Sequence, residues 1–283
     1  MADSAFQTQY RQELIDGFEQ RQSLIRQTVT TEAMIKGGTA VFLVADSGSA
    51  TAVTRGLNGL LPYRANNLTQ STATLQEWHD PVRMTGFNIF ASQGDLVAKM
   101  QKDAVGTINR KIDDDIIDQL ETLTNDTGAA STMSLDLFLH AKTILGNNAV
   151  PFDGNIFAII SPAAEAYLLQ TSEFGSADYV AKKPVASGET AFDDQVKMYD
   201  WLGVKIIVHP RVPGVGTSAE KLFMFHRDSI GHAFDSKGLQ TFMNYNEEHD
   251  YSFVRTSVYM GSKLLQNAGG VLINHDASGF AAS

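Results

Sequence analysis

Apolar residues recur at every fourth position along one stretch in the first half of the chain. They are Leu96, Met100, Ala104, Ile108, Ile112, Ile116 and Leu120, with Leu123 three residues further on. An α-helix brings residues four apart onto one face. The spacing therefore predicts a helix over residues 92–123, about 45 Å long at ~1.5 Å per residue. The turn-forming run Asn-Asp-Thr-Gly at 125–128 ends it.

A long segment of small and polar residues, residues 47–67, is difficult to place inside one compact domain. It is rich in Gly, Ser, Thr and Asn, which favour turns. Loops longer than about 12–15 residues are uncommon in compact domains and are usually functional or disordered. The segment also carries Leu57, Leu60, Leu61 and Tyr63. Each of these side chains would lose about 1.5–3 kcal/mol of burial free energy in water, so they need a surface to pack against.

The composition excludes several classes of protein. The 283 residues contain no cysteine, which excludes disulfides, thiolate metal sites and cysteine nucleophiles. The N-terminus lacks the apolar core of a signal peptide, and the longest dense apolar run, TAVFLVA, is much shorter than the ~20 residues of a membrane span. A formal net charge of −10 with scattered basic residues argues against a nucleic-acid reader. We expect a soluble protein of a cytosol-like compartment.

The first eighty residues contain one further predicted helix and two predicted strands. An apolar side chain every four residues predicts an amphipathic helix over residues 5–27, with a stripe formed by Phe6, Tyr10, Leu14 and Phe18. TAVFLVA (39–45) predicts a strand. Polar sequence then continues to about Asp80, and the alternating run PVRMTGFNIF predicts the next strand.

The second half alternates helices and strands, which predicts a compact α/β region over residues 132–245. The expected elements are the helix SLDLFLHAKTIL, the strand NIFAII, the helix SPAAEAYLLQ, and the strands VKIIVH and KLFMFH. Ser161 as N-cap and Pro162 at the first helical position mark the start of the second helix. The chain closes with a long alternating strand, DYSFVRTSVYMGSKLL, and a short one, VLINHD. We expect these two to form a hairpin across QNAGG.

One acidic motif suggests metal chemistry. Asp114, Asp115 and Asp118 have the DDxxD spacing, which on a helix places three carboxylates within one turn, where they can hold magnesium against a diphosphate. Enzymes with this motif carry a second aspartate-rich motif and are almost wholly helical, and neither holds here. A solvated acidic helix face is the simpler interpretation. A magnesium-dependent enzyme using these residues is kept as an alternative of another class.

The other candidate motifs are weaker. PGVGTSA (213–219) loosely matches a dinucleotide-binding loop, but a strand rather than a helix follows it, so it is interpreted as a turn. EEHD (247–250) is interpreted as a charged turn before the last long strand. Neither HExxH nor GxSxG occurs. We therefore expect no catalytic, cofactor-binding or metal-binding residues and a protein that is not an enzyme.

The order of elements resembles the tailed-bacteriophage major capsid protein family, which has the Hong Kong 97-type fold. FEQRQSLIRQTV (18–29) is similar to the arm before the first strand. VAKMQKDAVGTINRKIDDDIIDQLE (97–121) is similar to the spine helix. HAKTILGNNAVPFDGNIFAIISPAAEAYLL (140–169) is similar to the core of the axial domain, and VRTSVYMGSKLLQNAGGVLI (254–273) is similar to the closing strand and hairpin of the peripheral domain.

The resemblance implies an α+β fold with a defined division of the chain. Residues 1–44 would form the N-terminal arm and first strand, and residues 45–80 the extended two-stranded loop. Residues 81–131 would form the peripheral domain with the spine helix, and residues 132–245 the axial domain. Residues 246–283 would return to the peripheral domain.

The resemblance also implies a structural function. The subunit would self-assemble into hexamers and pentamers of an icosahedral phage head that encloses double-stranded DNA. The extended loop would lie on a neighbouring subunit, which answers what its apolar side chains pack against. The implied intersubunit contacts are Phe6, Tyr10, Leu14 and Phe18 of the arm, and Arg55, Leu57, Leu60, Leu61, Tyr63 and Arg64 of the loop.

The implied partners follow from the same resemblance. They are further copies of the chain, a separate scaffolding protein, a portal protein, a decoration protein and packaged DNA in non-specific contact, with no membrane and no cofactor. The location would be the virion capsid, after assembly in the cytoplasm of the host bacterium. An encapsulin-type bacterial nanocompartment shares the fold and is the nearest alternative, because it differs only in enclosing cargo enzyme instead of DNA.

Overall fold

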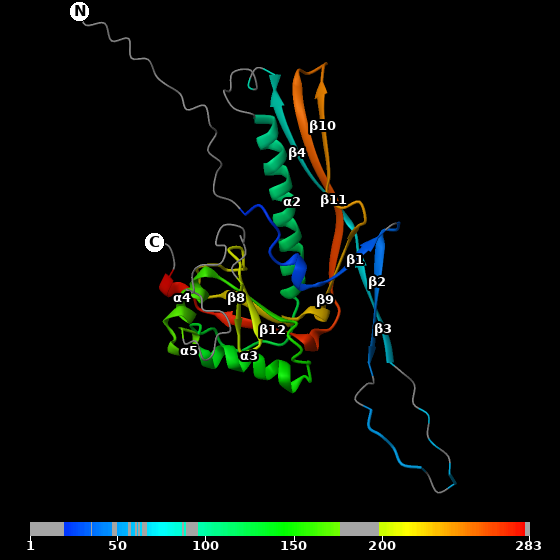
Figure 1. Cartoon of the computed structure of the whole chain (residues 1–283), viewed down its shortest axis with the longest axis vertical. Coiled ribbons are helices and arrows are strands. Elements are labelled where there is room, and N and C mark those ends of the chain that lie inside the picture. Colours follow the sequence, from blue (N-terminus) through cyan, green and yellow to red (C-terminus); the bar gives the residue numbers. More distant parts are fainter. Residues whose placement is uncertain are drawn as a thin grey trace, which may run out of the picture.

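The computed structural model describes residues 20–34, 36–46, 50–55, 58–59, 61, 63, 67–86, 88, 96–175 and 198–280. The strands in these residues form three sheets. One five-stranded sheet extends along the long helix α2, and a second forms a compact α/β unit with the shorter helices (Figure 1). The third is a two-stranded ribbon that projects from the body of the molecule.

The predicted long helix is confirmed as α2, which spans Leu96–Leu120. The apolar stripe is buried along its described length, from Met100 to Leu123. The helix packs against β11 (Tyr251–Leu264) and β4 (Gln76–Thr85). No helix in the described residues is both long enough and apolar enough to cross a membrane.

The sheet beside α2 is built around β11. β4 lies antiparallel along one edge of β11, and β9 (Ile230–Asp235) and β10 (Gln240–Asn246) lie antiparallel along the other. The pairing of Met260 shows this arrangement, because Met260 lies opposite Phe234 of β9 on one side and opposite Gln76 of β4 on the other. β1 (Thr30–Met34) runs parallel to β9 and completes the sheet.

The α/β unit holds the largest part of the core. Its strands are, in sheet order, β12 (Gly270–His275), β8 (Glu220–His226), β5 (Ile156–Ile160), β7 (Val204–Val208) and β6 (Met198–Trp201). Its helices are α3 (Leu135–Asn147), α4 (Pro162–Gln170) and α5 (Ser172–Gly175). Trp201 is fully buried against the rings of Phe138 and Phe174, at centroid distances of 4.8 and 5.0 Å. The predicted start of α4 is confirmed, since the Ser161 hydroxyl accepts a hydrogen bond from the Ala164 amide.

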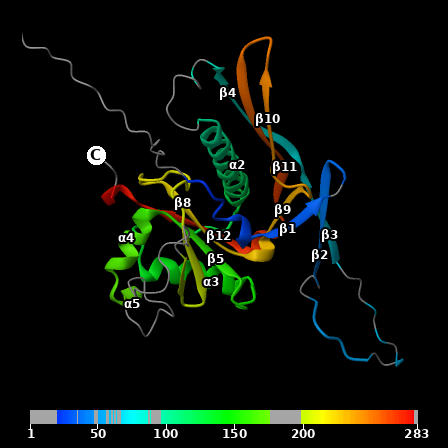
Figure 2. The same cartoon turned by 45° about the horizontal axis from the view of Figure 1, so that its top comes forward.

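The projecting ribbon consists of β2 (Thr39–Asp46) and β3 (Asn67–Thr74), paired antiparallel in continuous register. Figure 2 shows it leaving the body on the side away from α3 and α4. The base of the ribbon crosses the sheet of β11 at two glycines, Gly261 of β11 and Gly231 of β9. A Cβ on Gly261 would lie 2.2 Å from the backbone oxygen of Thr74, and one on Gly231 would lie 2.8 Å from the ring of Phe42. At these two positions the ribbon therefore lies directly on the backbone of β9 and β11.

One prediction for the first eighty residues is wrong within the described residues. Residues 20–25 are not helical, and only a short 3-10 helix, Arg26–Thr28, follows them. The reason is a buried carboxylate, described below, that binds backbone amides of this segment. Residues 67–80, which lie in the expected two-stranded loop, contain β3 and half of β4. Pairing with β2 and β11 satisfies the backbone of this polar sequence.

The prediction of a closing hairpin is wrong as well. β11 and β12 do not pair; a 3-10 helix, Asn267–Gly269, separates them, and β12 pairs with β8 in the other sheet. This also corrects the expected division of the chain. β12 lies within residues 246–283 but belongs to the sheet of the α/β unit, whereas β9 and β10 lie within residues 132–245 but belong to the sheet of β11. Long-range pairing, which local patterns do not encode, decides these memberships.

Candidate assembly interface

The β2–β3 ribbon carries apolar side chains on the face turned away from its own sheet. Strand residues alternate between faces, and Ala40 and Phe42 face inward, where they are buried with Ala233. The register places Val41, Leu43 and Leu68 together on the opposite face. These three side chains are 55%, 68% and 67% exposed. No element of the described chain covers this face, so it is available to another molecule.

The part of the loop beyond the ribbon is also exposed where the structure describes it. Among the predicted contact residues, Arg55 is exposed, Leu61 is 55% exposed and Tyr63 is 100% exposed. Val53, which is not among the predicted contact residues, is 60% exposed. The other predicted contacts lie outside the described residues, and they are Phe6, Tyr10, Leu14, Phe18, Leu57, Leu60 and Arg64.

The base of the arm is fixed to α2 by one buried carboxylate, Asp113. This side chain is fully buried, and both of its oxygens accept hydrogen bonds from residues far away in sequence. The donors are Gln20 Nε2 (2.5 Å), Ser23 Oγ (2.5 Å), the Leu24 amide (3.0 Å), the Ile25 amide (3.3 Å) and His209 Nε2 (3.2 Å). Asp113 therefore joins three parts of the molecule: the base of the arm, the long helix and the end of β7.

The tautomer of His209 follows from its neighbours. Its Nδ1 accepts a hydrogen bond from the Arg211 amide at 3.2 Å, so the ring proton lies on Nε2 and is donated to Asp113. Asp113 was not among the residues predicted from the sequence, because the DDxxD carboxylates that follow it were selected instead. One signal was present: Asp113 directly follows Ile112 and lies three and four residues before Ile116 and Ile117, on the buried side of the helix.

The three DDxxD carboxylates lie in separate environments. Asp114 forms an ion pair with Arg211 at 2.7 Å, and its partial burial raises the pKa of this carboxyl. Asp115 accepts a hydrogen bond from Ser262 Oγ at 2.6 Å, and burial raises its pKa too. Asp118 is exposed. The described residues contain no group of three side chains placed to hold a metal ion, so this geometry does not favour the magnesium alternative.

A hydrogen-bonded chain connects α2 with β11 and β9. Asp115 accepts from the Ser262 hydroxyl, and Ser262 Oγ accepts from His232 Nδ1 at 2.9 Å. His232 is fully buried and stacks on Phe234, which lies under the Arg26 guanidinium at 4.3 Å. Burial, reinforced by the charge of Arg26, lowers the pKa of His232 from 6.5 to about 4. His232 is therefore neutral in the folded subunit at neutral pH.

This lowered pKa predicts a pH-dependent stability. Between pH 6.5 and about 4 the unfolded chain binds a proton at His232 that the folded subunit does not. Above pH 6.5 His232 therefore leaves the free energy of unfolding unchanged, and as the pH falls to about 4 its preferential protonation in the unfolded chain lowers that free energy by at most ~3.5 kcal/mol, at about 1.4 kcal/mol per pKa unit. Urea unfolding of the unassembled subunit at several pH values measures it. His232→Asn should show a smaller loss than the parent, whereas the exposed control His249→Asn should match the parent; equal slopes for all three would contradict the prediction.

Comparison with known proteins decides the family. A family model described as phage capsid protein matches residues 2–277. The chain belongs to the phage capsid protein family. Among curated protein sequences, none matches this capsid protein.

Solved structures with low sequence identity share the fold of this capsid protein. A structure from Mycobacterium phage Che8 has a TM-score of 0.74 at 17% identity and covers 97% of this chain and 98% of its own. The capsid of cyanophage P-SCSP1u has a TM-score of 0.70 at 12% identity, with coverage of 96% and 93%. The capsid of Ralstonia phage GP4 has a TM-score of 0.68 at 12% identity, with coverage of 97% and 96%. The predicted α+β fold of the Hong Kong 97 type is confirmed.

Proposed function

We propose that this capsid protein is the major subunit of a phage head and self-assembles into hexamers and pentamers of an icosahedral shell around double-stranded DNA. One observation carries the proposal. The projecting ribbon exposes Val41, Leu43 and Leu68 on a face that its own subunit leaves bare. Each side chain forgoes about 1.5–3 kcal/mol of burial free energy in a lone subunit, which contact with a neighbour recovers.

The proposed contacts continue from the ribbon into the loop beyond it. Arg55, Leu61 and Tyr63 are exposed and suited to lie on a neighbouring subunit. Arg55 is suited to bind a carboxylate there through paired hydrogen bonds. The proposed partners are a scaffolding protein, a portal protein, a decoration protein and non-specifically bound DNA. Assembly takes place in the host cytoplasm.

Assembly of the purified protein tests this function. Expressed alone and together with its scaffolding protein, the chain is expected to sediment as capsomers or closed particles, and negative-stain images are expected to show rings, tubes or shells. A protein that stays a folded monomer at high concentration under both conditions would overturn the proposal. Nuclease-protected DNA in particles from infected cells identifies a phage head, whereas protein cargo would identify an encapsulin-type compartment.

A further inference from the structure

The sheet beside α2 ends in a strand with a free hydrogen-bonding edge. β10 pairs with β11 over its full length, from Gln240 opposite Ser257 to Asn246 opposite Tyr251. Within the described ranges no strand pairs with its other edge. Figure 1 shows β10 as the outermost strand of the upper part of this sheet, across β11 from β4. Among the described residues, no strand covers the backbone groups along this edge, and the Tyr245 amide donates to the Asn244 Oδ1 of its own strand at 2.8 Å.

β10 lacks the features that protect edge strands from pairing with other chains. Its sequence, QTFMNYN, contains no charged residue and no proline. It exposes Phe242, Met243 and Tyr245 by 47%, 54% and 48%. Proteins usually block such an edge with lysine, proline, a bulge or a covering element. An unprotected, apolar edge is expected where the assembled protein covers it with a further strand.

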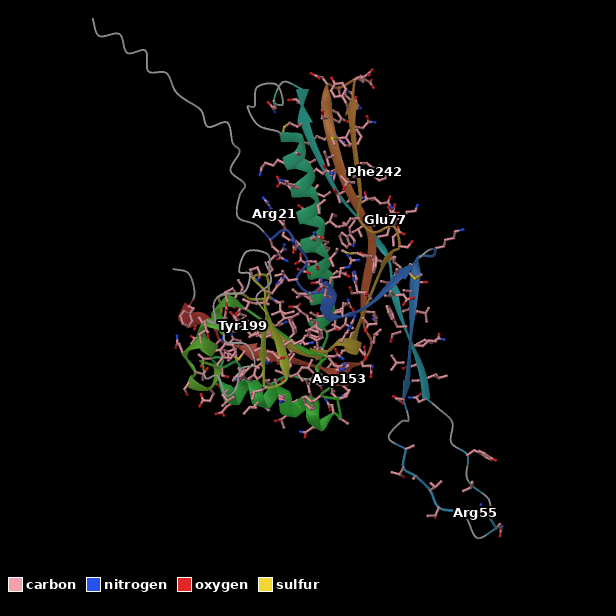
Figure 3. The ribbon with its side chains drawn as sticks, viewed as in Figure 1. Arg21, Arg55, Glu77, Asp153, Tyr199 and Phe242 are labelled. Atoms are coloured by element: carbon pink, nitrogen blue, oxygen red, sulfur yellow. The ribbon has the colours of Figure 1, made fainter. Side chains whose placement is uncertain are left out.

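A second segment of the same chain is suited to pair with such an edge, because it belongs to no sheet of its own subunit. Residues 50–55, Ala-Thr-Ala-Val-Thr-Arg, are exposed and have no regular secondary structure. Threonine and valine favour the extended conformation. Figure 3 places Arg55 near the lower end of the subunit and Phe242 in its upper half, so this segment lies far from β10 of its own chain. A second copy of the chain would bring the two together.

Strand direction follows from the sheet and from charge. β9 and β10 pair with the same edge of β11, and β1 runs parallel to β9 on the far side of β9 from β11. The position beside β10 continues the line of β1. The turn after β10 carries Glu247, Glu248 and Asp250, all exposed. A parallel strand would place Arg55, at the end of its segment, beside this acidic turn, whereas an antiparallel strand would place it beside uncharged Gln240.

We propose that residues 50–55 of one subunit add as a parallel strand to the free edge of β10 in a neighbouring subunit, with Arg55 beside the acidic turn at 247–250. The inference rests on the proposed function, because it requires assembled subunits. It names the surface that receives the loop, and it assigns backbone pairing, rather than side-chain packing alone, to the contact.

The absence of cysteine in the chain makes a disulfide test free of background. Val53→Cys is combined with Asn244→Cys on β10, because a parallel strand with Arg55 near Asn246 places these two residues side by side. The matched control combines Val53→Cys with Arg83→Cys on β4. Asn244 and Arg83 both pair with Phe253, so they occupy the same rung of the sheet on opposite edges of β11. Only the edge differs between the two variants.

The expected result is specific to one edge. Oxidised particles of the Val53→Cys, Asn244→Cys variant should give a ladder of linked subunits on a non-reducing gel, which reducing agent removes, and the Arg83→Cys control should give monomers. Particles without a ladder, or with an equal ladder from the control, would overturn the inference and leave the proposed function intact. A ladder from Tyr10→Cys with Asn244→Cys would assign the edge to the arm and also overturn it. Failure of the parent to form particles would overturn both.

Charge reversal tests the direction of the strand independently. Arg55→Glu places a negative charge beside the acidic turn of the neighbour, so the yield of particles should fall. Glu247→Arg in the same chain restores opposite charges and should recover the yield. Reversal at Glu32 on β1, which is exposed and outside the proposed contact, serves as the control and should not rescue. Equal yields in all variants, or rescue by Glu32→Arg, would rule out the parallel arrangement.

Discussion

Deleting residues 49–65 is expected to leave a folded subunit that no longer forms stable shells. The deletion joins Gly48 to Asn66, and only three residues then connect Asp46 with Asn67, which already pair across the ribbon. Three-residue hairpin loops that contain glycine are common, so the ribbon can close. The described side chains within the deleted segment are exposed and contribute nothing to the core. Circular dichroism on heating measures folding, and sedimentation measures assembly.

The comparison variant for this deletion is Ile112→Asp. Ile112 is 1% exposed in the centre of α2, so the new carboxylate would be buried without a partner. We expect a loss of roughly 3–5 kcal/mol in the free energy of unfolding, enough to unfold most single domains. The two variants thus separate assembly from folding. A deletion that unfolds the chain as fully as Ile112→Asp would show that the loop belongs to the core of its own subunit.

Replacing Asp113 by alanine is expected to detach the base of the arm and to destabilise the subunit strongly. The change leaves donors from residues 20–25 and from His209 buried or partly buried without an acceptor. Removing one partner of a buried, charged hydrogen-bond network typically costs about 3–5 kcal/mol. Urea unfolding measures the loss, and limited proteolysis should cut the arm near residue 20 faster than in the parent.

The neighbouring residue provides the matched control. Asp114 is also an aspartate on α2, but its ion pair with Arg211 is partly exposed, with side-chain exposures of 28% and 42%. Ion pairs near the surface contribute about 0–1 kcal/mol, so Asp114→Ala should change stability little and leave proteolysis unchanged. If the two alanine variants were equally stable, the network around Asp113 would not hold the arm.

The parts of the fold that were predicted correctly are those that local sequence determines. The apolar spacing of helix α2 repeats over many turns, and the stripe it forms is the buried face of the helix. The start of α4 is similarly local, because Ser161 and Pro162 satisfy the geometry of a helix N-terminus themselves.

The parts that were missed depend on residues far apart in sequence. Asp113 contacts donors 88 to 96 positions away, and these contacts replace the helix expected over residues 20–27. β3 is too polar to be identified alone and exists because β2 pairs with it. β12 follows β11 directly but finds its partner in β8. Apolar spacing along one segment contains no information about such partners.

The candidate interface was predicted in part for the same reason. The distal loop was selected because its composition is unusual for a core, and its described residues are exposed. Val41 and Leu43 were assigned to an ordinary strand, since sequence does not show that nothing covers their face. β10 was not predicted at all, because QTFMNYN lacks a regular apolar pattern. What marks it is the free edge, which only the arrangement of strands reveals.

The crossing of the β2–β3 ribbon over Gly231 and Gly261 makes the loop a lever with a short fulcrum. At Gly261 the backbone of Thr74 lies on backbone, at Gly231 the Phe42 ring lies on backbone, and the small side chain of Ala233 packs beside them. A strand of eight residues spans about 26 Å, so a rotation of about 10° at the fulcrum moves its far end by roughly 5 Å. Hexamers and pentamers set neighbouring subunits at different angles. In the proposed shell, this lever would let one sequence meet both angles while its core stays the same.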